Sequence, residues 1–231
     1  MIQAQDEFVE YLRPGKFIDS DHPDVMAFSS RIADAETSPV GKAVALYYAV
    51  RDGFRYDPYH IDLGREAMRA SALLTRDHGF CISKAALLSA AARHQGIPAR
   101  LGFADVRNHL TTPKLRQAMG TDVFVWHGFA ELLLSGRWIK ATPAFDRALC
   151  ERFRVAPLEF DGRRDAVFQE VDARGNRFME YLADRGHYAD IPLETLRVAL
   201  EEAYPLVVVG GEWNLAGRFE EDVVADLGDG A

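Results

Sequence analysis

The sequence has only two cysteines, Cys81 and Cys150, among its 231 residues. So few thiols do not make a disulfide framework, although a single bridge between these two remains open. The N-terminal residues also lack the basic segment, apolar core and small-residue cleavage site of a secretion signal. We therefore expect a reduced, cytoplasmic protein.

Long apolar runs and an excess of basic residues are also missing. The longest apolar runs, such as residues 205–209, are far too short to cross a bilayer. The formal net charge of −8 is unfavourable for non-specific binding to nucleic acid or to anionic lipid. We therefore predict neither a nucleic-acid nor a membrane partner, and the sequence leaves the oligomeric state open.

Internal repeats, low-complexity runs and Gly/Ser-rich linkers are absent as well. The chain is long enough to bury a substantial core, and we interpret it as one domain over residues 1–231. Residues 226–231 are expected to form a short frayed tail.

The N-terminal part carries apolar residues at helical spacing. Ser38 followed by Pro39 is typical of a helix start, and Gly96 is typical of a helix end. Helices are predicted over residues 24–33, 38–51, 67–75 and 81–96.

After Pro98 the sequence becomes rich in β-branched and aromatic residues. Ser135-Gly136 is interpreted as a hairpin turn. Beyond Pro143 the chain is expected to be mostly loop, before one more helix over residues 193–204. Strands are predicted over residues 99–103, 123–134 and 137–141. Helices followed by an antiparallel sheet indicate an α+β fold.

Cys81 lies at the predicted start of a helix. Unpaired N–H groups and the positive end of the helix dipole favour a thiolate there. With a histidine nearby, such a site can lower a cysteine pKa from about 8.5 to roughly 3.5–7.5. The same N–H groups can hold a developing oxyanion. A free cysteine is also often a small buried apolar residue, so position alone leaves both interpretations open.

His127 lies near the start of the predicted hairpin, 127 − 81 = 46 residues after Cys81. A histidine that faces a cysteine can act as general base and then protonate the leaving group. A histidine packed beside Trp126 is the structural alternative. The other histidines lack close metal-ligand spacing, so we predict no metal and no cofactor.

A third feature follows the return strand of the hairpin. With the turn at residues 135–136, residues 142–144 are expected to lie across from residues 127–129. A polar side chain there could orient the imidazole through its second ring nitrogen.

These segments together resemble the transglutaminase-like superfamily of cysteine acyl-transfer enzymes and peptidases. The resemblance spans roughly residues 43–146 and rests on "LYYAVRDGFRYDP", "GFCISKAALLSAAARHQGIPAR" and "WHGFAELLLSGRWIKATPAF" in this order. It implies a papain-like α+β fold with N-terminal helices followed by an antiparallel sheet, and a C-terminal extension over residues 147–231. It also implies that Cys81 is the nucleophile and His127 its base.

The sequence departs from the family at the third catalytic position. The family has an aspartate four residues after the tryptophan, where this chain has Thr142. A threonine hydroxyl can fix the ring orientation but cannot offset the charge of an imidazolium. Asp146 is the first candidate to supply a carboxylate instead, and Asp122 and Glu131 are further ones. If no side chain fills this third catalytic position, the protein would be a catalytically degenerate binding module.

The sequence thus predicts a cysteine-dependent hydrolase or acyl transferase that acts on a peptide, amide or acyl substrate. Its predicted catalytic residues are Cys81, His127, Asp146 and Thr142. Hydrolysis is favoured over transfer, because water needs no second binding site. The alternatives are a non-catalytic binding module and arylamine N-acetyltransferase-like chemistry with acetyl-CoA, for which we find no basic phosphate cradle.

Overall fold

The computed structural model describes residues 8–109, 111–168, 178–209 and 212–228. A four-stranded antiparallel sheet in the order β6-β5-β4-β7 forms its centre. Its strands are β4 (Ala99–Asn108), β5 (Val123–Leu134), β6 (Arg137–Ala141) and β7 (Met179–Tyr188). Helices come first in the chain and this sheet follows, which confirms the predicted α+β, papain-like fold class.

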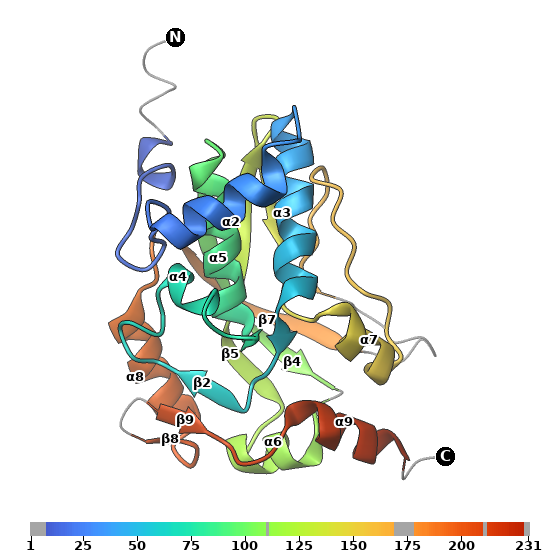
Figure 1. The fold of residues 1–231 in the computed structure, drawn as a ribbon. Helices are drawn as coiled ribbons and strands as arrows, with labels where there is room; N and C mark the ends of the chain where they lie inside the picture. Colours follow the sequence, from blue (N-terminus) through green and yellow to red (C-terminus); the bar gives the residue numbers. More distant parts are fainter. Residues whose placement is uncertain (1–7, 110, 169–177, 210–211, 229–231) are drawn as a thin grey trace.

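Three helices cover one face of this sheet (Figure 1). Helix α5 (Cys81–His94) packs directly on β4 and β5, and α2 (Pro23–Ala33) and α3 (Pro39–Gly53) pack on α5. Every residue of α5 except His94 is buried, because the helix has neighbours on both sides. This explains why its sequence is rich in small and apolar residues on all faces.

Shorter elements surround this core. Strands β1 (Arg55–Tyr56) and β3 (His78–Gly79) pair in parallel just before α5, and β2, β9 and β8 form a separate small sheet. The remaining elements are η1 (Val9–Tyr11), β2 (His60–Asp62), α4 (Ala70–Leu73), α6 (Pro113–Met119), α7 (Arg147–Phe153), α8 (Leu193–Ala203), β8 (Val208–Val209), β9 (Glu212–Asn214) and α9 (Phe219–Gly228).

The predicted hairpin is confirmed residue by residue, since β5 and β6 have the predicted bounds. Ser135 and Gly136 have positive φ angles of 52° and 77°, as a tight two-residue hairpin turn requires. Strand β4 extends five residues beyond the predicted end at Phe103 (108 − 103 = 5). The helix predicted over residues 67–75 is shorter and spans Ala70–Leu73.

The C-terminal third corrects two expectations. The region beyond Pro143 contains α7, β7, β8, β9 and α9 in addition to the predicted helix, here α8. The tail expected from residue 226 is helical to Gly228. Strand β7 was not predicted from the sequence. It pairs only with β4 at the sheet edge, and most of its residues are exposed or half-buried. It therefore has little of the apolar alternation that marks a strand with one buried face.

A buried lysine ties three segments together next to the start of α5. Lys84 is fully buried, and its ammonium donates to the carbonyl oxygens of Arg51 (2.8 Å), Phe54 (2.7 Å) and Ala144 (2.8 Å). These carbonyls belong to the end of α3 and to the chain after β6. Because a buried donor without partners would be costly, Lys84 holds both segments against the first turn of α5.

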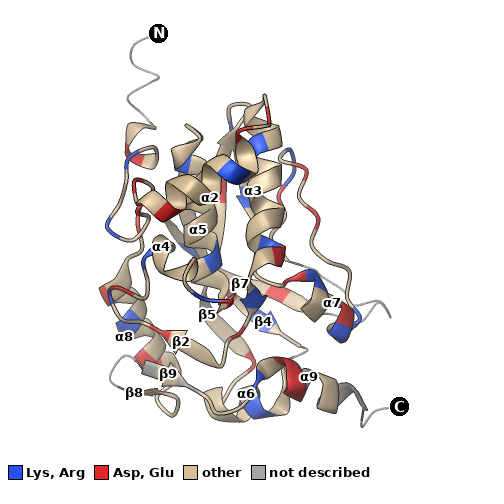
Figure 2. Ribbon diagram, in the orientation of Figure 1, with Lys and Arg blue, Asp and Glu red and all other residues tan. Residues whose placement is uncertain are grey.

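Charged residues are interspersed along the helices and strands (Figure 2). Several form ion pairs, such as Arg55 with Asp77 (3.1 Å) and Arg107 with Asp122 (3.3 Å). Among the described residues, no helix combines the length and apolar character that a membrane span requires.

Candidate active site

Cys81 is the first residue of α5, as the sequence predicted. The N–H of Phe80 donates to Ser83 Oγ at 3.0 Å, which closes the entry to the helix. Burial raises the pKa of the Cys81 thiol to about 11. The backbone N–H groups of Gly128, Ile82 and Cys81 itself hydrogen-bond the sulfur and lower its pKa, but burial outweighs them.

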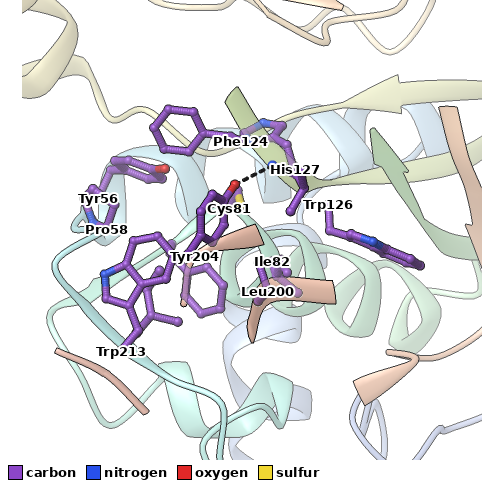
Figure 3. Close-up of a pocket in the computed structure, with 13 residues that line it drawn as sticks. Tyr56, Pro58, Cys81, Ile82, Phe124, Trp126, His127, Leu200, Tyr204 and Trp213 are labelled. Carbon is purple, nitrogen blue, oxygen red and sulfur yellow. Dashed lines mark hydrogen bonds between the residues drawn. The ribbon is translucent and has the colours of Figure 1, made fainter. Parts of the chain in front are cut away.

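His127 lies on β5, opposite Ala104 of β4, and lines the same pocket as Cys81 (Figure 3). Its side chain is buried, and this burial lowers the pKa of the imidazole to about 4. The structure therefore brings together the two residues that the sequence singled out. Burial thus shifts both pKa values against the charged forms, which favours a neutral thiol and a neutral imidazole.

Gly128 allows β5 to approach the start of α5 this closely. A Cβ atom on Gly128 would lie 3.0 Å from Ile82 Cγ1 and 3.2 Å from Ile82 Cα. A side chain here would therefore require β5 and Ile82 to move apart by a few tenths of an ångström. The sequence contains this glycine within the quoted motif, but its spatial role depends on the packing of two distant segments.

A β-bulge lies next to His127 in β5. Between Phe124 and His127, β5 has one residue more than the facing part of β4. Trp126 within the bulge has a φ angle of 57°, in the left-handed region that bulky residues rarely occupy. Bulges of this kind often re-aim a side chain next to an active site.

Side chains from other segments hold both N–H groups of the bulge. The N–H of Trp126 donates to Asp105 Oδ1 at 3.1 Å, and Arg185 of β7 pairs with the same carboxylate at 2.6 Å. The N–H of Val125 donates to the Tyr204 hydroxyl at 2.6 Å, and this hydroxyl donates to the carbonyl of Val123 at 2.9 Å. Sequence reasoning missed Asp105, Arg185 and Tyr204, because no local pattern links them to His127.

Thr142 lies close to the ring of His127. The two residues line a common cavity of about 10 Å³. Thr142 Oγ1 and His127 Nε2 are both buried and have no hydrogen-bond partner in the described part of the chain. Thr142 follows directly after Ala141, whose pairing with Ala130 is the last of the β5–β6 ladder.

The carboxylate of Asp146, a candidate to orient His127, accepts hydrogen bonds from two backbone N–H groups. It caps α7, where Oδ1 accepts the N–H of Leu149 at 3.0 Å, while Oδ2 accepts the N–H of Tyr56 at 2.9 Å. Both oxygens are thus engaged by backbone groups. Of the other carboxylates considered, Asp122 pairs with Arg107 at 3.3 Å and Glu131 pairs with Arg100.

Two further observations concern the possible disulfide and the possible metal site. Cys81 and Cys150 are both free thiols, so the bridge between them is not formed. Within the described residues, no group of three His, Cys, Asp or Glu side chains is arranged to hold a metal ion.

The fold and the site define the class of protein. A helix-borne cysteine and a strand-borne histidine share one pocket within a papain-like α+β fold. The family model of the transglutaminase-like superfamily matches residues 26–143, slightly more than half of the chain. The chain belongs to this superfamily.

Two solved structures are similar to the chain. One is described as a putative cysteine protease from Cytophaga hutchinsonii, with 17% identity and a TM-score of 0.48 over 79% of this chain and 54% of that one. The other is described as a putative protease from Parabacteroides distasonis, with 14% identity and a TM-score of 0.37 over 51% of this chain and 22% of that one. The chain thus spans about half the length of the first structure. No curated protein matches it.

Proposed function

We propose that the protein is a cysteine-dependent hydrolase of amide or ester bonds, with Cys81 as nucleophile and His127 as general base. The observation that supports this most directly is that a cysteine at the first residue of a buried helix shares one pocket with a histidine. Membership of a superfamily of cysteine acyl-transfer enzymes and peptidases agrees with it.

The reaction starts from the neutral pair. As the Cys81 sulfur bonds to the carbonyl carbon, its proton passes to His127 and the carbonyl π electrons move to the oxygen. The oxyanion accepts hydrogen bonds from backbone N–H groups at the start of α5, among them that of Cys81, which bonds the sulfur in the resting protein. His127 then gives its proton to the leaving nitrogen or oxygen as the bond to it breaks. A thioester of Cys81 remains.

Water completes the cycle. His127 takes a proton from a water molecule while its oxygen attacks the thioester carbon. The carbon–sulfur bond then breaks, the acid leaves, and the sulfur recovers its proton from His127. An amine in place of water would make the enzyme a transferase, but this requires a second binding site.

We propose that Thr142, and not Asp146, orients the ring of His127. Thr142 and His127 line the same cavity, and Thr142 Oγ1 and His127 Nε2 both lack a hydrogen-bond partner in the residues described. The volume of this cavity, about 10 Å³, is close to the roughly 10–15 Å³ that one water needs. A water can therefore bridge the two atoms. The carboxylate of Asp146, in contrast, is occupied by the N–H groups of Leu149 and Tyr56.

A pH profile tests the mechanism. Hydrolysis of p-nitrophenyl acetate should require neutral His127, and it should be lost as the pH falls through the His127 pKa of about 4. Cys81→Ala and His127→Ala should both reduce hydrolysis to background, while Cys150→Ala, which removes the other buried thiol, should leave it unchanged.

Alkylation of Cys81 by iodoacetamide separates this mechanism from its alternatives. For a neutral pair, the rate should rise about tenfold per pH unit towards the thiol pKa of about 11. A rate that is already maximal at pH 6 would instead indicate a resting thiolate–imidazolium pair. A protein that shows no Cys81-dependent hydrolysis at any pH would be the binding module that Thr142 suggests.

A further inference from the structure

We propose that the pocket beside Cys81 binds a short, uncharged aliphatic acyl group, so that the substrates are amides or esters of small aliphatic carboxylic acids. This inference rests on the proposed function, because it assigns the acyl side of the bond that Cys81 attacks. Three properties of the pocket support it, namely the chemistry of its walls, its volume and the packing of its walls.

The pocket walls are almost entirely apolar. Beside Cys81 and His127, aromatic rings and aliphatic chains enclose the space, including Phe124, Trp126, Leu200, Tyr204 and Trp213 (Figure 3). None of the lining residues is a lysine, arginine, aspartate or glutamate. A carboxylate or ammonium group on the acyl chain would therefore be buried without a counter-charge, which is strongly unfavourable.

The volume of the pocket limits the size of the group. The pocket measures about 40 Å³, whereas a single water needs roughly 10–15 Å³ on this scale. The space between the walls therefore has room for about three heavy atoms, such as the chain of a propionyl or butyryl group. A phenyl ring is larger than this space and would extend beyond it.

The walls are packed in a way that resists expansion. The rings of Tyr204 and Trp213 meet edge to face at 5.4 Å, and Trp126 packs on Phe103 at 5.3 Å. The Tyr204 hydroxyl is also held by the backbone of Val125 and Val123. A larger acyl group would have to displace these packed rings, which costs free energy.

Protection of Cys81 from iodoacetamide tests the pocket without requiring turnover. Butyramide should slow the alkylation of Cys81 about tenfold at about ten times its dissociation constant. Phenylacetamide, which is too large, and succinamate, which is charged, should give no protection at the same concentrations. Equal protection by the three amides, or protection by none, would overturn the proposal.

Variants at Leu200 of α8 test whether the protection of Cys81 arises from binding in this pocket. Leu200→Glu should abolish protection by butyramide, whereas Val198→Glu on the same helix should not, because Val198 is 55% exposed and outside the pocket. Should Leu200→Glu fail to fold by circular dichroism, Leu200→Ala replaces it. The alanine variant should enlarge the pocket and shift the preference from butyramide to hexanamide. An unchanged preference would contradict the assignment.

The two proposals can fail separately. Selective protection of Cys81 without hydrolysis of any ester would retain the pocket and reject the catalytic function. Cys81-dependent hydrolysis of p-nitrophenyl butyrate, phenylacetate and hydrogen succinate at similar rates would retain the function and reject the pocket.

Discussion

The two sides of the candidate site are built differently. Cys81 is held by the local geometry of a helix start, with Ser83 closing the entry and Lys84 anchoring the first turn. His127 is held by a bulge in β5 whose N–H groups are bonded by Asp105 and Tyr204, far away in the sequence. The cysteine side is therefore a regular helix start, which Ser83 closes and which Lys84 ties to α3 and to the chain after β6. The histidine side is an irregular strand whose bulge is held by side chains of other elements.

This difference has an energetic consequence. The helix start needs no unusual backbone angle, whereas Trp126 is in the left-handed region at a φ of 57°. Such a conformation costs of the order of 1–3 kcal/mol and persists only when the surroundings enforce it. We therefore expect the histidine side to be the more sensitive to substitutions at a distance.

The largest effect is expected from separating the two sides. Gly128→Ala would place a Cβ about 3 Å from Ile82 and push His127 away from Cys81. Relief of this contact requires a shift of a few tenths of an ångström. Because a displacement of about 1 Å can cost about 100-fold in rate, we expect a decrease of roughly 20-fold in kcat/KM for p-nitrophenyl acetate. Gly53→Ala is the matched control, since a Cβ there meets nothing within 4 Å. Unchanged activity in Gly128→Ala would show that the close approach is not needed.

A smaller effect is expected from weakening the histidine side alone. Asp105→Ala removes the acceptor of the Trp126 N–H and the partner of Arg185, and we expect about tenfold lower kcat, corresponding to about 1.4 kcal/mol. Asp105→Asn should recover most of the activity, because its amide oxygen can still accept this N–H.

The control for this prediction is the reactivity of Cys81. At pH 10 and above, alkylation by iodoacetamide depends on the thiolate and not on His127, so Asp105→Ala should react like the parent protein. An equal loss of hydrolysis and alkylation would mean that the substitution disturbs the fold and does not act on His127.

The smallest effect is expected at Thr142. Thr142→Val keeps the shape but removes the hydroxyl of Thr142, which lines a cavity with His127, and we expect a decrease in kcat of about threefold, or roughly 0.7 kcal/mol. Thr142→Ser, which keeps the hydroxyl, should restore the rate. If the valine and serine variants are equally active, the hydroxyl has no part in orienting the ring.

The elements that the sequence predicted correctly depend on neighbouring residues. The alanine- and leucine-rich run after Cys81 and the Ser135-Gly136 turn gave the start of α5 and the bounds of β5 and β6. The elements that it missed have two different causes. Strand β7 is recognisable only by its pairing with the distant β4. Helix α7 has a local start signal, because Asp146 caps it through the N–H of Leu149, but the sequence interpretation assigned Asp146 to the catalytic site instead.

The residues of the candidate site also differ in how far the sequence alone could identify their roles. From sequence, Cys81 at a helix start and His127 at a hairpin could be selected as a pair, and Thr142 and Asp146 could both be considered for the third position. The support for Thr142 comes from its position beside His127, and the engagement of Asp146 comes from its contact with Tyr56, 146 − 56 = 90 residues away.

The sequence by itself thus determined where the helix of Cys81 begins, where the hairpin of His127 turns, and which family these segments resemble. Local propensities and short-range hydrogen bonds suffice for these features. Only the tertiary structure decided that the two residues share one pocket, that burial shifts both pKa values against the charged forms, and that the pocket walls are apolar. These properties depend on packing and desolvation, which arise when segments far apart in the chain come together.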